Sequence, residues 1–278
     1  MTDLTIHTYT AAEPGLFVNS YLLETTAGVV LVDANLLVSD AKALAARLTA
    51  LRKPLLAAFV THPHPDHFNG LPYVADENVP VYATTAVAET IAATAADKRT
   101  QWQPVYGDQW PDRVRVPDHR LDDGAAVHLG DLRIEVHDAG PGESHADSYL
   151  TIHCGSHQAA FIGDLAFHGT HSYLSDGHSS AWLRTLDHLA DDLAGITLYP
   201  GHGPKADASL LSDQRRYLLM YREAVGRIAA GSPTLTDTQK TELAVVLTRY
   251  LPQAPLSWLV ALGADAIAAE LAEERAAA

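Results

Sequence analysis

Three histidines and one aspartate lie within the six residues from His62 to His67, in the segment THPHPDHFNG. Pro63 and Pro65 exclude a regular helix or strand over this stretch and stiffen the loop. Removing so many titratable side chains from water costs free energy unless a partner compensates for it. The apolar run LLAAFVT, residues 55–61, predicts a short strand that ends where the histidines begin. A divalent metal ion is the partner that imidazoles and a carboxylate in such a cluster favour.

Three later loops carry further side chains that can bind a metal. His145 lies in GPGESHADS, Asp164 ends the strand-like run FIGD, and His202 lies in LYPGHGP. Each comes at or just beyond the end of an apolar segment that predicts a strand. We expect one edge of the sheets to deliver these side chains into a common cleft.

The periodicity of the chain alternates twice between strand-rich and helical stretches, followed by helices alone. Strands are predicted at residues 20–25, 28–34, 55–61, 79–84, 126–130, 132–139, 148–154, 158–164 and 196–200. Helices are predicted at residues 39–51, 69–77, 86–102, 179–193, 210–221 and 236–251. Ser39 and Thr236 are the expected N-caps of their helices. This α+β pattern predicts two sheets packed face to face with helices outside and a helical C-terminal extension.

Composition limits the class of partner. The 278 residues are 47% apolar, which supports a sizeable core, and the net charge of −15 disfavours nucleic acids and anionic membranes. No apolar run reaches about 18 residues, and the first ten residues do not have the pattern of a signal peptide. Cys154, the single cysteine, is expected to be a buried strand-end residue. We therefore expect a cytoplasmic protein that acts on a small molecule, with a homo-oligomer left open.

The ordered motifs resemble those of the metallo-β-lactamase superfamily. They are H-x-H-x-D-H, a later histidine, a Gly-Asp after a strand and a Pro-Gly-His-Gly loop, and they span residues 18–204. The resemblance implies a four-layer αββα sandwich over residues 1–205, with metals at one edge. Residues 206–278 would form a helical extension packed on it.

The resemblance also assigns a role to each motif residue. His62, His64 and His145 would bind a first metal, Asp66, His67 and His202 a second, and Asp164 would bridge the two. Two zinc ions per chain are implied, with iron or manganese as alternatives. A hydroxide between the metals would be the nucleophile, and Asp66 would be the catalytic residue that orients it and returns a proton to the leaving group.

Two residues narrow the choice within the superfamily. Relatives with flavin-linked di-iron sites have a glutamate where this chain has His64, and one large class of β-lactamases has a cysteine where Asp164 stands. The chain is closest in motif to hydrolases of the glyoxalase II and lactonase type, so a thioester, lactone or ester is the expected substrate. A β-lactamase-like amidase, a mononuclear-iron sulfur dioxygenase and a non-catalytic metal-binding module are the alternatives.

The third motif departs from the pattern of many relatives, because Glu143 and Ser144 stand between its glycine and His145. His145 is the preferred ligand because imidazole suits zinc, and Glu143 is expected to hydrogen-bond a ligand imidazole. On this basis His145→Ala would lose the first metal, whereas Glu143→Gln would keep both. The opposite result would place the ligand two residues earlier.

Three further residues are candidates near the site. His171 and Tyr173 follow Asp164 on a loop and are candidate substrate contacts, with a structural role as the alternative. Asp33 ends the strand-like run VVLVDA and either hydrogen-bonds the metal loop or caps the strand end. Most of the other histidines among the chain's 15 are expected to be ordinary surface or hydrogen-bonded residues.

Overall fold

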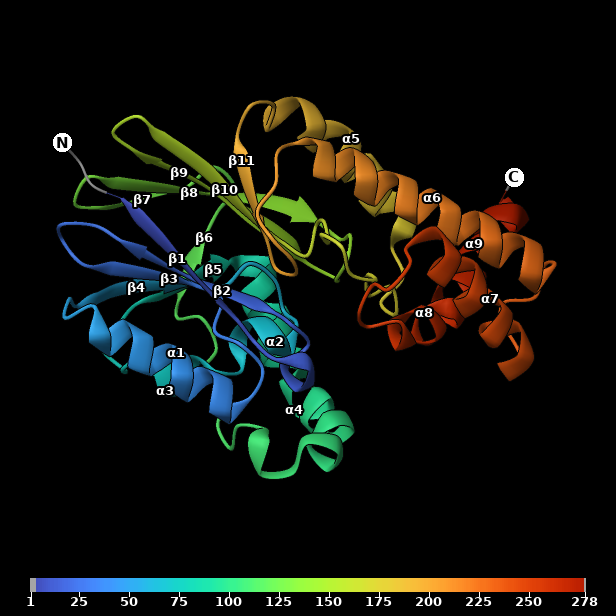
Figure 1. Cartoon of the computed structure of the whole chain (residues 1–278), viewed down its shortest axis with the longest axis horizontal. Helices are drawn as coiled ribbons and strands as arrows, with labels where there is room; N and C mark the ends of the chain where they lie inside the picture. The colour runs from blue at the N-terminus through green and yellow to red at the C-terminus, as the bar shows by residue number, and fades with distance from the viewer. Residues whose placement is uncertain (1–3, 278) are drawn as a thin grey trace.

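The computed structural model describes residues 4–277 and contains two β-sheets between layers of helices (Figure 1). The six strands of the first sheet lie in the order β1 (Thr5–Thr10), β2 (Asn19–Glu24), β3 (Val29–Val32), β4 (Leu55–Phe59), β5 (Val81–Thr84) and β6 (His119–Leu121). The first three are antiparallel, and β3 to β6 are parallel. Strands β1 and β6, at the two edges of this sheet, were not predicted from the sequence.

The second sheet has five strands and runs mostly antiparallel. Their order is β11 (Thr197–Pro200), β10 (His157–Gly163), β9 (Asp147–Cys154), β8 (Leu132–Gly140) and β7 (Ala126–Leu129). Only β10 and β11 pair in parallel. The carboxyl ends of β10 and β11 therefore lie at the same edge as the amino end of β9.

Alternating side chains of the first sheet bury two different faces. Leu22 and Leu31 pack among helix residues such as Leu44, whereas Tyr21 and Val30, one position earlier on each strand, face the second sheet. The second sheet in turn buries its other face beneath helices. This confirms the predicted four-layer αββα sandwich with a helical extension, and Cys154 is buried in the layer between the sheets.

The helices fall into two groups. Those beside the first sheet are α1 (Val38–Ala50), α2 (Pro65–Phe68), α3 (Leu71–Val74) and α4 (Thr85–Tyr106), and two short 3-10 turns, η1 (Glu13–Gly15) and η2 (Gly107–Gln109), accompany them. The prediction of Ser39 as an N-cap was wrong, because α1 begins one residue earlier, at Val38, and no side chain caps it. Thr236 caps its helix as predicted and forms a complete capping box with Gln239.

The second group of helices joins the extension to the sandwich. It consists of α5 (Ser179–Asp192), α6 (Ser209–Ala229), α7 (Asp237–Tyr250), α8 (Trp258–Leu262) and α9 (Ala264–Ala277). Side chains of α6, α7 and α9 share one continuous core with Leu165, Phe167 and Trp182. The extension thus packs directly beneath the segment that follows β10. Within residues 4–277, no helix is long and apolar enough to cross a membrane.

Candidate metal centre

Strand ends from both sheets deliver the predicted ligand residues to one place. His62 and His64 follow β4, Asp66 and His67 lie in α2, Asp164 follows β10 and His202 follows β11. The expectation that the two prolines exclude a helix was wrong at Pro65, because proline is tolerated at the first helical position and begins α2 there. The short helix starts directly after His64 and turns Asp66 and His67 toward the other side chains. All six residues are buried, with exposures of 8% or less.

The third motif delivers Glu143 to this cluster and leaves His145 outside it. Glu143 is fully buried, with 0% exposure, whereas the side chain of His145 is 53% exposed and its Nδ1 lies 2.7 Å from Nε2 of His178. The turn explains the difference. Ser144 donates from its backbone N–H and its hydroxyl to the carboxylate of Asp147, and this tight turn directs residue 143 inward. The structure therefore does not support the preference for His145 as the third-motif ligand.

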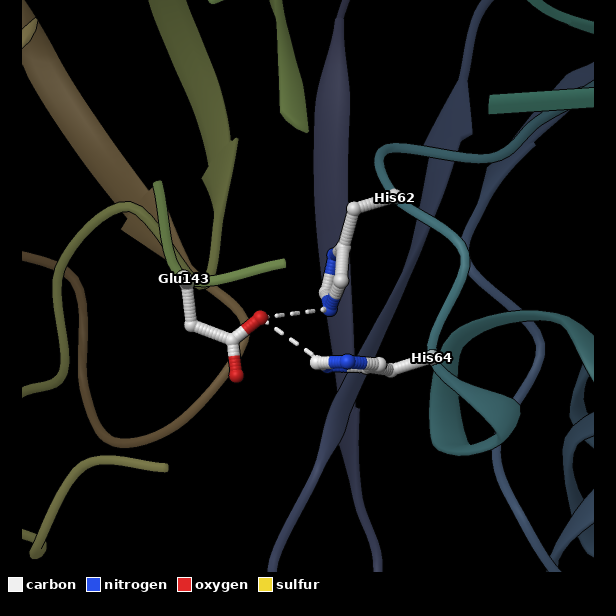
Figure 2. A group of neighbouring side chains, drawn as sticks. All are labelled: His62, His64 and Glu143. Atoms are coloured by element: carbon white, nitrogen blue, oxygen red, sulfur yellow. Dashed lines mark ion pairs between the residues drawn. The ribbon is translucent and has the colours of Figure 1, made fainter. Parts of the chain in front are cut away.

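Glu143 and two histidines form the first group that could hold a metal ion. Figure 2 shows both imidazoles pointing from the loop after β4 toward the carboxylate. Oε2 of Glu143 lies 2.9 Å from Nδ1 of His64 and 3.5 Å from Nε2 of His62. Two imidazoles and one carboxylate are a donor set that catalytic zinc and non-haem iron both accept.

A second group, Asp66, His67 and His202, lies beside the first, and Asp164 lies between the two. Oδ2 of Asp164 is 3.4 Å from Nε2 of His202 and 4.0 Å from Nε2 of His62, and its Oδ1 is 3.4 Å from Nε2 of His67. Metal–ligand bonds of roughly 2.0–2.2 Å in tetrahedral geometry require ligand atoms about 3.3–3.6 Å apart. The two spacings of 3.4 Å fit ligands that share a metal ion, and Asp164 also lies within 4.0 Å of His62 in the first group.

Each imidazole is held by its second ring nitrogen. His62 Nδ1 lies 3.1 Å from the Thr61 hydroxyl, His64 Nε2 lies 3.0 Å from Asp176, His67 Nδ1 lies 2.8 Å from Asp33, and His202 Nδ1 lies 2.9 Å from the carbonyl oxygen of Leu16. These contacts fix each ring so that its free nitrogen faces the centre, which is the usual arrangement for metal-binding histidines.

Asp33 hydrogen-bonds the loop that carries the histidines, which is one of the two roles expected for it from the sequence. Its carboxylate accepts from the backbone N–H and hydroxyl of Thr61 and contacts His67. Asp176 makes the equivalent contact to His64 and was not identified from the sequence. It lies 112 residues further along the chain, in a loop with no periodic pattern.

The buried carboxylates draw positive charge to this centre. Although burial alone would lower it, the pKa of His202 is raised to about 10 by the charge of Asp164, and that of His64 is raised to about 10 by Glu143 and Asp176. Nε2 of His62, Nε2 of His67 and Oε1 of Glu143 have no hydrogen-bond partner among residues 4–277. A divalent cation would supply both the charge and the missing partners, so the residues fit a metal centre.

The comparisons with known proteins agree with this geometry. A sequence profile described as the metallo-beta-lactamase superfamily matches residues 14–202, which is most of the chain. The chain belongs to the metallo-β-lactamase superfamily. The enzyme class expected from the sequence, a metal-dependent hydrolase, is thereby confirmed.

Solved structures show the same metallo-β-lactamase fold. A beta-lactamase domain protein from Burkholderia ambifaria is 19% identical, with a TM-score of 0.68, and the match covers 99% of this chain and 89% of that one. A metallo-beta-lactamase from Pontibacter korlensis is 21% identical with a TM-score of 0.61, over 79% of this chain and 99% of that one. TTHA1623 in a di-iron-bound form is 25% identical with a TM-score of 0.58, over 76% and 99%. A search of curated proteins found no match.

A cleft leads from the metal centre of this metallo-β-lactamase fold to the surface. Asp66, Glu143 and Asp164 lie at its base. Tyr173 also lines it, as a substrate contact should, and its hydroxyl donates to Asp176 at 3.0 Å. His171 does not line it. Its imidazole is fully buried and contacts the Tyr217 hydroxyl, so the structure gives His171 the structural role named as the alternative.

Gly201, in the Pro-Gly-His loop, has no room for a side chain. A Cβ at this position would lie 2.0 Å from Oδ1 of Asp164 and 2.7 Å from Cε1 of His67. We expect Gly201→Ala to displace both ligands, to reduce bound metal and to lower kcat/KM about tenfold or more, because small displacements of reacting groups are costly. Elemental analysis and hydrolysis rates test this.

Gly226→Ala is the matched control, since its Cβ would meet only Leu271 at 3.7 Å. Full metal content and full activity in the Gly201→Ala protein would contradict the close approach of this loop to Asp164.

Proposed function

We propose that the protein is a hydrolase with two divalent metal ions that cleaves an acyl bond of a small molecule. The observation that carries the proposal is the pair of adjacent donor groups, His62–His64–Glu143 and Asp66–His67–His202, with Asp164 between them. One tetrahedral ion needs four ligands, and seven converge here. A thioester, lactone or ester is the favoured substrate, and a β-lactam or related amide is the alternative.

The bound metals would provide the reactive chemistry, and the protein would hold the metals and orient the reacting groups. When bound, two divalent ions lower the pKa of a water molecule toward neutrality and polarise a scissile carbonyl. The chain fixes the imidazoles through Thr61, Asp176, Asp33 and the carbonyl of Leu16. This fixed geometry avoids rearrangement of the ligands during the reaction.

Asp66 is the residue proposed to move a proton. Its Oδ2 lies 3.3 Å from Nε2 of His202 and 3.7 Å from Nε2 of His67, and the residue also faces the cleft. A carboxylate in this position can orient the attacking oxygen and afterwards deliver a proton to the departing sulfur or oxygen.

The donor sets support a proposal about which metals bind. Zinc remains the proposed metal, since two imidazoles and a carboxylate form catalytic zinc sites. The exchange of His145 for Glu143 makes the first group richer in oxygen, which strengthens the case for iron or manganese. TTHA1623, a structural neighbour, was solved in a di-iron-bound form.

A second candidate activity is the iron-dependent oxygenation that the sequence analysis named as an alternative. The group His62–His64–Glu143 has the two-histidine, one-carboxylate composition of non-haem iron oxygenases. The complete second group at Asp66, His67 and His202 favours hydrolysis instead, because a mononuclear site would not need it. The cytoplasmic location, the absence of nucleic-acid and membrane partners and the oligomeric state stay predictions.

Metal content tests the two candidates directly. We expect two metal ions per chain, complete loss of hydrolysis after chelation, recovery on adding zinc, and a lower melting temperature of the metal-free protein. Elemental analysis, thermal unfolding and a panel of thioesters, lactones and β-lactams measure these effects. One iron per chain together with consumption of oxygen would instead establish the dioxygenase.

A further inference from the structure

The cleft above the metal centre is walled by aromatic and aliphatic side chains from two distant parts of the chain. One wall contains Trp102 and Tyr106 of α4 and Trp110 just after η2. The other contains Leu256, just before α8, and Trp258, the first residue of α8. The chain has four tryptophans, and three of them line this one cleft.

The first wall is an ordered row of rings. The centroids of Trp102 and Tyr106 lie 6.3 Å apart, and those of Tyr106 and Trp110 lie 6.1 Å apart with an interplanar angle of 25°. Rings at these distances support one another and present a continuous apolar surface. This wall is therefore shaped before any ligand binds.

The second wall is anchored to the body of the protein. The carbonyl oxygen of Pro255 accepts from the backbone N–H of His171 at 3.2 Å, and the carbonyl of Val260, which is buried, accepts from the Tyr221 hydroxyl. Trp258 nevertheless remains 46% exposed where it lines the cleft. A large exposed ring on an anchored segment marks a surface that a ligand can cover.

Charge is scarce along these walls. Apart from the residues of the metal centre, Lys98 is the one charged side chain among the described residues that line the cleft. Its Nζ lies 5.9 Å from the ring centroid of Tyr173, whose hydroxyl is bound to Asp176. Among residues 4–277, no carboxylate outside the metal centre and no cation other than Lys98 lines the walls.

We propose that the cleft is a binding site for an uncharged, apolar acyl group attached to the scissile carbonyl, such as a straight chain of about six to ten carbons. This inference rests on the proposed acyl hydrolysis, because the carbonyl must lie over Asp66, Glu143 and Asp164 at the base. The apolar group then extends between the tryptophan row of α4 and Trp258. Each methylene group that is fully buried adds about fourfold to binding.

A series of thioesters tests chain length. The metal-loaded protein is supplied with acetyl, hexanoyl and decanoyl thioesters of N-acetylcysteamine, and kcat/KM is measured for each. We expect the hexanoyl compound to exceed the acetyl compound at least about tenfold, well below the limit for four fully buried methylene groups. The adipoyl thioester, which has the same length and a terminal carboxylate, should fall at least about tenfold below the hexanoyl compound.

Variants of the two walls test the location. Trp258→Ala and Trp102→Ala should each reduce the ratio of decanoyl to acetyl kcat/KM at least about fivefold, and Trp258→Phe should restore most of it. Val245→Ala is the control, since Val245 is also 46% exposed but does not line the cleft. Equal ratios in the wild-type protein and both alanine variants would overturn the proposal.

A binding measurement separates this inference from the proposed function. Decanamide, an uncharged compound, should change the tryptophan fluorescence at concentrations where acetamide does not, and Trp258→Ala should weaken its binding. Hydrolysis of acetyl thioesters without any chain-length preference would overturn the apolar site and leave the hydrolase standing.

If no thioester is hydrolysed, the lactones and β-lactams of the wider panel test the hydrolase proposal, and the decanamide titration alone decides on the apolar site. Saturable binding that Trp258→Ala weakens would support the apolar site, and no binding would overturn it. A concentration-dependent dimer that Trp258→Ala dissociates, with no response to decanamide, would also overturn it, since the ring would then belong to an interface between two copies of the chain.

Discussion

Glu143→Gln should remove one of the two metal ions and lower kcat roughly 10³-fold or more, because a neutral amide replaces a charged ligand of the first metal. Glu143 is fully buried beside His62 and His64, and nothing else in the third motif reaches them. Burial raises the pKa of the Glu143 carboxyl, and glutamine has nearly the same shape, so the metal-free Glu143→Gln protein should still fold. Elemental analysis, kcat and thermal unfolding measure the three effects.

His145→Ala is the matched control from the same loop. Its side chain is exposed, and its nearest ring contact is His178. It should keep both metals and turn over within about twofold of the wild-type protein, as surface substitutions usually do. Loss of metal from the His145→Ala protein, with both metals retained in Glu143→Gln, would reverse the assignment and restore the ligand set first expected from the sequence.

Asp66→Ala should lower kcat by at least about 10²-fold, the usual scale of lost acid–base catalysis. The residue contacts His67 and His202 and faces the cleft, so its removal affects both the second metal and the path of the proton. The two effects can be separated. If Asp66 supplies a proton to the leaving group, the loss should be larger for thioesters with a poor leaving group than for those with a good one, even with metal restored.

Asp131→Ala, at an exposed position, controls for the loss of one negative charge. Wild-type turnover in a folded Asp66→Ala protein would remove Asp66 from the mechanism. An equal loss on good and poor leaving groups would restrict Asp66 to holding metal.

Much of the architecture could be read from the sequence because apolar periodicity and burial coincide here. Leu22 and Leu31 alternate with Tyr21 and Val30 as strands between two apolar layers require. The two edge strands were not predicted, because β1 (TIHTYT) is mostly polar and β6 (HRL) is short, so neither carries a clear apolar periodicity.

Residues of the candidate metal centre could be anticipated where they are close in sequence or follow a predicted strand, and not where a turn decides which side chain points inward. Four candidate ligands lie within six residues, which indicates a metal site without any knowledge of the fold: His62, His64, Asp66 and His67. The choice between Glu143 and His145 depends on the hydrogen bonds of Ser144 to Asp147, which spacing does not reveal. The one available signal was that Glu143 directly follows the Pro-Gly pair.

Contacts between distant residues could not be predicted where neither a motif nor a strand end marks the residue. Asp176 contacts His64 across 112 residues, and Trp102 and Trp258 line one cleft from α4 and α8. Such contacts depend on how the layers stack. Periodicity describes single elements and carries no information about that stacking.

The core that joins α6, α7 and α9 to Leu165 and Phe167 couples local unfolding of these helices to the candidate metal centre. Asp164 immediately precedes Leu165, and the ring of Phe167 stacks on His202 at 5.2 Å. Local unfolding that detaches the C-terminal helices must therefore loosen the backbone that holds the carboxylate of Asp164. Metal ions that bind only when these helices are packed in place would slow amide hydrogen exchange in the helices, although none of the proposed ligands lies in them.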